Sequence, residues 1–163
     1  MTDLALACTP DLGALRAAAQ AVLPGLSVAV ERVDAVAPSG PAPAADVWLG
    51  VVERAPETGF PCGVCVGVRL APEHDLEDWL RDFGEALSRA LEARVLVGDT
   101  RVGPTPSPYW CLVWDAGVPH LGDDSETDPA EGPPGPVRLV RRLDLPEHDR
   151  VALAARVLRG VGG

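Results

Sequence analysis

The sequence predicts a single α+β domain, in which helices pack on an antiparallel sheet of five to six strands. Helix signals occur at 9–23, 73–92 and 146–159, and segments with strand-type alternation separate them. Consecutive strands with short links are largely antiparallel, because parallel neighbours need a long crossover. The predicted element order is therefore α-β-β-β-α-β-β-β-α. A chain of 163 residues, 47% of them hydrophobic, is long enough to bury one core.

The N-terminal part of the chain predicts one helix and three strands. Thr9 is a candidate cap, a proline and an acid follow it, and the helix ends at Pro24-Gly25. Alternating apolar residues then predict strands at 26–33, 48–53 and 63–70. Proline, alanine and glycine predict a loop at 34–45 and a turn region at 55–61.

The helix at 73–92 has the clearest pattern in the chain. Its apolar residues recur at helical spacing and form one stripe: Leu76, Trp79, Leu80, Phe83, Leu87, Ala90 and Leu91. Pro72 opens the helix, and acids crowd its first turn, where the helix dipole favours negative charge. We expect the stripe to be core and the acidic face to point outwards.

Short strands and a long loop are expected after this helix. Strands are predicted at 94–97, 109–115, 118–121 and 137–143. Ala116-Gly117 suits a hairpin turn, although Pro119 weakens its second arm. The segment 122–136 is acidic and rich in proline and glycine, which predicts a long loop. A last helix is expected at 146–159, opened by Pro146.

The surplus of negative charge lies in two segments. Seven acids and two arginines give residues 73–92 a charge of −5, and five acids without a base give residues 122–136 another −5. The whole chain carries −10. Such a field disfavours nucleic acid and anionic lipid, and it favours a basic protein partner, although solubility alone could explain it.

Eight residues are candidates for contact with that partner. Seven of them are acids in the two segments: Asp78, Asp82, Glu85, Asp123, Asp124, Glu126 and Asp128. Tyr109 is the eighth, because Trp110 and Trp114 share the opposite strand face, which we expect to be core. An exposed tyrosine beside an acidic loop would suit a binding hot spot.

No sequence motif in the chain identifies a chemical reaction. The chain has no lysine, which excludes the usual P-loop and Schiff-base chemistry. The pair Cys62-Gly-Val-Cys65 runs into a strand and lacks a second pair to complete a zinc site. We therefore expect no catalytic residue, no metal and no cofactor, and an enzyme or redox site at these cysteines is the third hypothesis.

The compartment follows from what the chain lacks. No run of about 18 apolar residues occurs, and the N-terminus lacks the basic region of a secretory signal. We expect a cytoplasmic protein that does not enter a membrane.

One segment resembles a known family. Residues 76–117 join an acid-rich helix to Arg-Val-Leu-Val-Gly-Asp and Tyr-Trp-Cys-Leu-Val-Trp-Asp-Ala-Gly. This combination resembles small bacterial immunity proteins over about a quarter of the chain. Such proteins neutralise a toxin, often a nuclease, by presenting acids to its basic site. The resemblance implies a tight, salt-sensitive complex made by acids from 73–85 and 123–131.

A second resemblance concerns the order of elements. The order α-β-β-β-α-β-β-α is similar to the type III secretion chaperone-like fold, whose members are small, acidic and often dimeric. The chain departs from it by an extra strand and by the long acidic loop. This resemblance implies a homodimer that holds an extended client protein.

Overall fold

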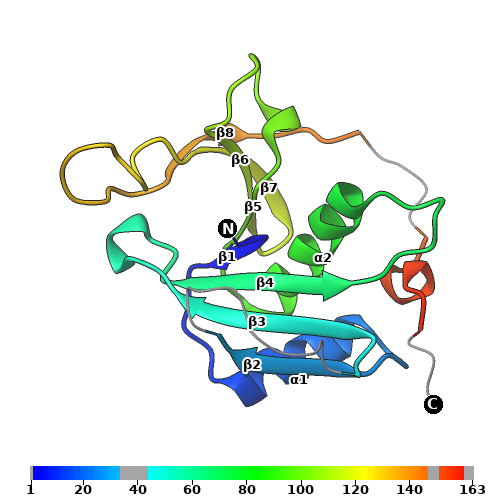
Figure 1. Ribbon diagram of the computed structural model, residues 1–163. Coiled ribbons are helices and arrows are strands. Elements are labelled where there is room, and N and C mark those ends of the chain that lie inside the picture. The colour runs from blue at the N-terminus through cyan, green and yellow to red at the C-terminus, as the bar shows by residue number, and fades with distance from the viewer. Residues whose placement is uncertain (1, 34–43, 147–150, 160–163) are drawn as a thin grey trace.

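The computed structural model describes residues 2–33, 44–146 and 151–159. Eight strands form one mixed sheet, and two α-helices pack on one of its faces (Figure 1). The strands are β1 (Leu4–Leu6), β2 (Val28–Arg32), β3 (Val47–Glu53), β4 (Cys62–Val68), β5 (Val95–Val97), β6 (Trp110–Asp115), β7 (Val118–Asp123) and β8 (Arg138–Arg142). The helices are α1 (Leu12–Val22) and α2 (Leu76–Leu91). The strand order is β2-β3-β4-β1-β5-β6-β7-β8. The α+β class is confirmed.

The strand that the sequence analysis missed lies at the centre of the sheet. β1 pairs antiparallel with β4 on one side, where Leu4 faces Val64, and with β5 on the other, where Leu4 faces Val97. All three of its residues are buried. A short strand that is covered on both faces shows no alternation, so its pattern carries no strand signal.

The prediction of an antiparallel sheet of five to six strands is wrong in the number of strands and for one pair, since the described sheet has eight strands and β2 runs parallel to β3. β2 and β3 run parallel, with Val28 opposite Val47 and Arg32 opposite Val51. The link between them spans residues 33–46, which is the dozen or more residues that a parallel connection needs. The predicted loop at 34–45 falls mostly outside the described residues. β3 and β4 are antiparallel, as expected.

The last predicted helix is not an α-helix where the structure describes it. Leu153–Arg156 form one 3-10 turn, and residues 147–150 lie outside the described part. After the turn the chain is extended, because Val157 bridges to Leu70 and the Leu158 N–H donates to the Arg69 carbonyl at 2.8 Å. Hydrogen bonds to the segment before α2 therefore replace the helical ladder.

Local signals explain the ends of the two helices. Asp11 caps α1 by accepting a hydrogen bond from the Ala14 N–H at 2.7 Å, and Asp75 caps α2 by accepting one from the Asp78 N–H at 3.1 Å. Both helices begin a few residues later than predicted, because aspartate in extended backbone takes the capping position. The middle of the α2 stripe is buried, at Trp79, Leu80, Phe83 and Leu87, whereas Leu76 at its start and Ala90 near its end are exposed.

The hairpin between β6 and β7 is confirmed. Ala116 and Gly117 have φ values of 48° and 82°, as two-residue turns with the twist of the flanking strands require. Pro119 is accommodated opposite Trp114. β7 extends to Asp123, so the first residues of the predicted acidic loop belong to the strand.

The main core lies between the sheet and the helices. Trp79 and Phe83 of α2 stack there with ring centroids 4.8 Å apart, and Trp114 packs in the same cluster, as its position on β6 predicted. A smaller cluster covers the other sheet face, where Phe60 contacts Cys111 and Val113. No helix of the described residues has the length and apolar character that crossing a membrane requires.

Side chains of neighbouring residues cover the glycines of β4. The Trp48 indole lies over Gly50 and Gly67, so closely that a Cβ atom at Gly50 would meet the ring at 2.5 Å. The Trp48 indole N–H donates to Glu31 at 2.8 Å, which holds the ring flat on the strands.

Candidate functional site

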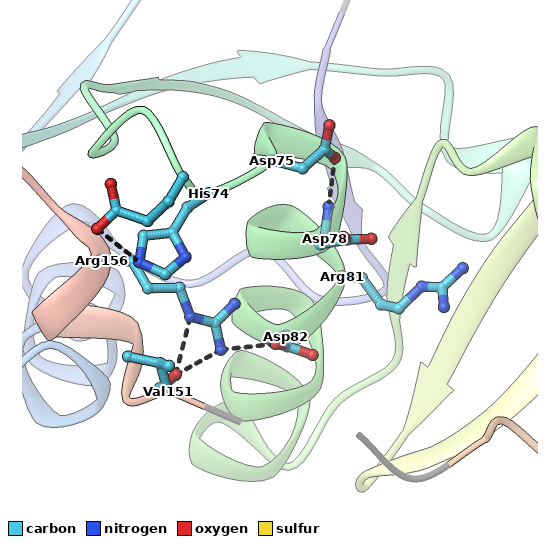
Figure 2. A pocket seen from close by; sticks show the side chains of 8 residues that line it. His74, Asp75, Asp78, Arg81, Asp82, Val151 and Arg156 are labelled. Carbon is cyan, nitrogen blue, oxygen red and sulfur yellow. Dashed lines mark hydrogen bonds and ion pairs between the residues drawn. The ribbon is translucent and has the colours of Figure 1, made fainter. Parts of the chain in front are cut away.

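A cleft of about 340 Å³ lies between the first turns of α2 and the C-terminal segment 151–156 (Figure 2). Its described lining consists of Glu73, His74, Asp75, Asp78, Arg81, Asp82, Val151 and Arg156. Four of these eight residues are acids and two are arginines. Segments that are far apart in the sequence therefore build one charged cleft.

The helix start places the acids of the cleft. Asp75 is the N-cap, and Asp78 and Asp82 follow at spacings of three and four residues, which puts all three along one side of α2. Glu73 precedes the helix in a turn that the His74 N–H closes by donating to the Ala71 carbonyl at 3.0 Å. The His74 ring lies 3.8 Å from the Glu73 carboxylate.

A buried ion pair holds the C-terminal segment against α2. The Arg156 guanidinium donates to Asp82 at 2.8 Å and to the Val151 carbonyl at 2.6 and 2.8 Å (Figure 2). The Trp79 indole N–H donates to the Leu153 carbonyl at 3.2 Å. Because the Arg156 guanidinium donates to these internal acceptors, its side chain does not project into solvent. Arg156 therefore forms one wall of the cleft.

The second arginine of the cleft points away from it. Figure 2 shows the Arg81 side chain directed away from Asp82, and its guanidinium donates to Asp99 at 3.1 Å. Arg101 donates to the other Asp99 oxygen at 2.9 Å and to Asp78 at 3.1 Å. Asp99 therefore binds two arginines with a side chain that is only 1% exposed.

The two arginines set the ionisation of Asp99. Burial alone would raise its pKa, but hydrogen bonds from Arg101 and Arg81 outweigh burial and hold the pKa below its usual range. The Asp99 carboxylate in turn raises the pKa of Arg101. The arginines beside the cleft are thus bound to carboxylates of the chain itself.

Among the described residues, the mouth of the cleft is therefore acidic. Glu73 and Asp75 are exposed, and the Asp78 side chain is 55% exposed although it contacts Arg101. Arg81 and Arg156 are directed to internal acceptors. A cationic side chain that entered the cleft would meet carboxylates first.

Two of the predicted partner-binding acids on α2 are buried, so the expectation that the acidic face of the helix points outwards is wrong for them. Asp82 is buried against Arg156, and Glu85 is buried with Arg89 at 3.1 Å. The prediction treated every acid of the helix as part of one outer face. The C-terminal segment lies against the side of α2 that carries Asp82. The β6–β7 hairpin lies close to Arg89, the partner of Glu85, so closely that a Cβ atom added at Gly117 would touch the Arg89 side chain.

The acidic loop lies on another side of the molecule. Figure 1 shows the connection between β7 and β8 projecting to the left, away from the red C-terminal segment that borders the cleft. Asp78 and the loop acids therefore do not form one surface. Tyr109 does belong with the loop, because the Asp124 N–H donates to its carbonyl at 3.0 Å. Its side chain is 53% exposed, as predicted.

The acids at the start of the loop are partly engaged. Asp123 contacts Arg138 at 3.0 Å, and hydrogen bonds from Ser125, followed by the contact with Arg138, lower its pKa. Burial, and then the nearby charge of Asp123, raise the pKa of Asp124. Glu126 and Asp128 are exposed. Four of the eight predicted residues are thus exposed: Asp78, Tyr109, Glu126 and Asp128.

The cysteine pair does not form a site. Cys62 and Cys65 are an odd number of residues apart on β4, so their side chains point to opposite faces of the sheet. Cys62 packs in the main core, and burial raises the pKa of both thiols. Within residues 2–33, 44–146 and 151–159, no group of three potential metal ligands occurs.

Three residues of the cleft region have no signal in the sequence. Asp99 and Arg101 lie in the connection after β5, and Arg156 lies in the segment that was predicted as a helix. In the pairs Arg81–Asp99 and Asp82–Arg156, the two residues are 18 or more positions apart along the chain. Only the tertiary fold brings them together.

Comparisons with protein-family models, with curated proteins and with solved structures give no match to this chain.

Proposed function

We propose that this chain is a protein-binding module of the immunity type, which neutralises a cationic toxin by receiving a basic segment in the α2 cleft. One observation carries the proposal. The described arginines of the cleft are turned to internal acceptors, whereas Glu73, Asp75 and Asp78 are exposed at its mouth, Asp78 with a contact to Arg101.

The size and charge of the cleft suit a basic side chain. A volume of about 340 Å³ is at the lower end of ligand pockets, which span roughly 300–1,000 Å³. It accommodates one or two arginine or lysine side chains more readily than a large cofactor. Carboxylates bind guanidinium groups through charge-assisted hydrogen bonds, which are stronger than neutral ones. The net charge of −10 would also accelerate encounter with a basic protein.

The cleft is a better docking surface than the acidic loop. Asp123 and Asp124 are only partly exposed, whereas Glu73, Asp75 and Asp78 of the cleft are all exposed. Asp75 and Asp78 are positioned by the helix and its cap, so less side-chain entropy is lost there when a partner binds. The loop therefore serves as the comparison surface in the test.

The experiment compares two isosteric double variants. Glu73→Gln with Asp78→Asn removes two charges at the cleft, and Glu126→Gln with Asp128→Asn removes two from the loop. Both change the net charge from −10 to −8. The wild type and both variants are immobilised, exposed to lysate of the source organism at low and high salt, and the retained proteins are identified by mass. Affinity for the retained basic protein is then measured by calorimetry.

We expect the cleft variant to bind about tenfold more weakly, which corresponds to about 1.4 kcal/mol, and the loop variant to bind within about twofold of wild type. Equal losses in both variants would show that only net charge matters. A loss in the loop variant alone would place docking at the loop. An extended client held equally at low and high salt would instead favour the secretion chaperone interpretation.

A further inference from the structure

β8 is the last strand of the sheet and offers an open edge. Among the described strands it pairs with β7 alone. Four of its five residues are exposed, and Val140 is 51% exposed. Leu139 packs on the smaller core cluster, which holds the strand in place. The strand is therefore anchored on one side and accessible on the other.

The backbone of this edge has groups that face away from β7. The Leu143 N–H donates to the Pro119 carbonyl at 2.9 Å, and Arg142 lies opposite His120. In an antiparallel ladder, alternate residues direct their N–H and C=O groups to opposite sides. The backbone groups of Arg142 thus point towards a ninth strand position.

The edge is basic although the protein as a whole is acidic. Three of the five residues of β8 are arginines. Arg138 is paired with Asp123, whereas Arg141 and Arg142 are exposed and contact no acid among the described residues. This charge opposes that of the cleft, so the two surfaces fit partners of different chemistry.

A second copy of the chain is a poor occupant of this edge. Antiparallel pairing of two β8 strands about Val140 would place Arg138 of each copy opposite Arg142 of the other. Like charges directly opposite each other destabilise a strand pair. Arginines and a bulge on an edge strand also discourage unspecific pairing, and the β7–β8 register does shift at Leu121/Gly122.

We propose that β8 accepts an extended, acidic segment of a partner protein as an added strand. The ladder would supply affinity through the open backbone groups. Arg141 and Arg142 are neighbours on β8 and lie on opposite faces of the strand, so each would select an acid on its own face, and the two acids would be adjacent in the added strand. Val140 would contact an apolar residue beside this acid pair. This surface is separate from the cleft, and the proposal does not depend on the immunity function.

The test uses defined probes with the full chain. The first probe is a fluorescein-labelled octapeptide with two adjacent glutamates at its centre, flanked by valine and threonine. The second carries lysine in place of glutamate, and the third is the glutamate peptide with every backbone amide N-methylated, which cannot donate to a ladder from either edge. Binding is followed by fluorescence anisotropy, and the contact site by amide chemical shifts of the ¹⁵N-labelled protein.

The variant Arg141→Glu/Arg142→Glu reverses the charge of the edge. Its control is Arg16→Glu/Arg32→Glu, which makes the same charge change on α1 and on the opposite edge strand β2, where both arginines are exposed. We expect the glutamate peptide to bind at about 1–100 μM and to shift amides of 138–143. The β8 variant should bind at least tenfold more weakly, and the control within about twofold.

Four results would overturn the proposal. The first three are no binding at a peptide concentration of about 1 mM, equal losses in the two variants, and amide shifts centred outside β7 and β8. Undiminished binding of the N-methylated peptide would show charge attraction without strand addition, which also contradicts it.

Discussion

Asp99 is the residue on which the charged network beside α2 converges. It binds Arg81 and Arg101, and Arg101 continues to Asp78 at the cleft. A buried carboxylate with two guanidinium partners fixes the side chains around it. The acid is therefore a structural support of the cleft, and its ionisation should be visible in the stability of the protein.

We expect Asp99→Asn to lower the free energy of unfolding by roughly 1–3 kcal/mol at pH 7. The pKa of Asp99 is lower in the folded protein than in the unfolded chain, where it is about 3.9. The carboxylate thus contributes stability above the unfolded pKa, and this contribution is lost as the pH falls through the folded pKa. Urea unfolding at pH 7, 5 and 3 should show the difference between wild type and variant shrinking with pH.

Asp124→Asn is the matched control, and it should change the free energy of unfolding in the opposite direction from Asp99→Asn. Burial raises the pKa of Asp124, so the ionised form is disfavoured in the folded protein at pH 7. The variant should be slightly more stable than wild type at pH 7, and the difference should vanish below about pH 4. A pH-independent loss in Asp99→Asn would show that its carboxylate acts through shape and not through charge.

At the scale of elements, more of the surface of α2 is buried by neighbouring segments than its apolar stripe indicates. The central apolar positions face the core as predicted, yet the acids Asp82 and Glu85 are also buried. The C-terminal segment covers one flank and is held there by Arg156. Periodicity identifies which residues avoid water, but it does not reveal a segment that packs over polar residues.

We expect Arg156→Met to lower the free energy of unfolding by roughly 3 kcal/mol, because Asp82 would lose its buried guanidinium and the Val151 carbonyl its donor. The segment 153–157 should also loosen. Hydrogen exchange is the direct readout, since the Ala71 N–H donates to the Arg156 carbonyl. Exchange of that amide should accelerate at least tenfold.

Arg159→Met controls for the loss of an arginine, because Arg159 is exposed. It should change stability by less than about 0.5 kcal/mol. If Arg156→Met were equally mild, the buried pair would contribute little to holding the segment. The double variant Asp82→Leu/Arg156→Met should then be compared, because hydrophobic replacement of a buried ion pair is often neutral or stabilising.

At the scale of the molecule, the charge is separated into distinct surfaces. The acidic cleft and the acidic loop lie on different sides, and β8 adds a basic edge (Figure 1). The formal net charge of −10 implies self-repulsion in the folded state. Internal pairs such as Arg81–Asp99 are screened only weakly by salt because they are buried.

We therefore expect added salt to stabilise the protein. Raising sodium chloride from about 20 mM to about 200 mM should increase Tm by a few degrees, because screening weakens surface repulsion more than it weakens the buried pairs. The loop variant Glu126→Gln/Asp128→Asn should show a smaller increase. A fall in Tm with salt would mean that ion pairs outweigh repulsion.

The sequence by itself determined the α+β class, the two helices and most of the strands. It also determined the stripe of α2, the β6–β7 turn and the exposure of Tyr109. These features depend on residues within one or two turns of each other. Apolar spacing, capping aspartates and turn residues act locally, so they can be read along the chain.

The tertiary structure decided the central position of β1, the parallel pairing of β2 with β3 and the composition of the cleft. The pairs Asp82–Arg156 and Arg81–Asp99 join residues that are 74 and 18 positions apart. Ionic groups attract one another at short range whatever their distance along the chain, and no local pattern records which of them will meet. Chain topology therefore separated the acids that are buried and paired from those that remain open to a partner.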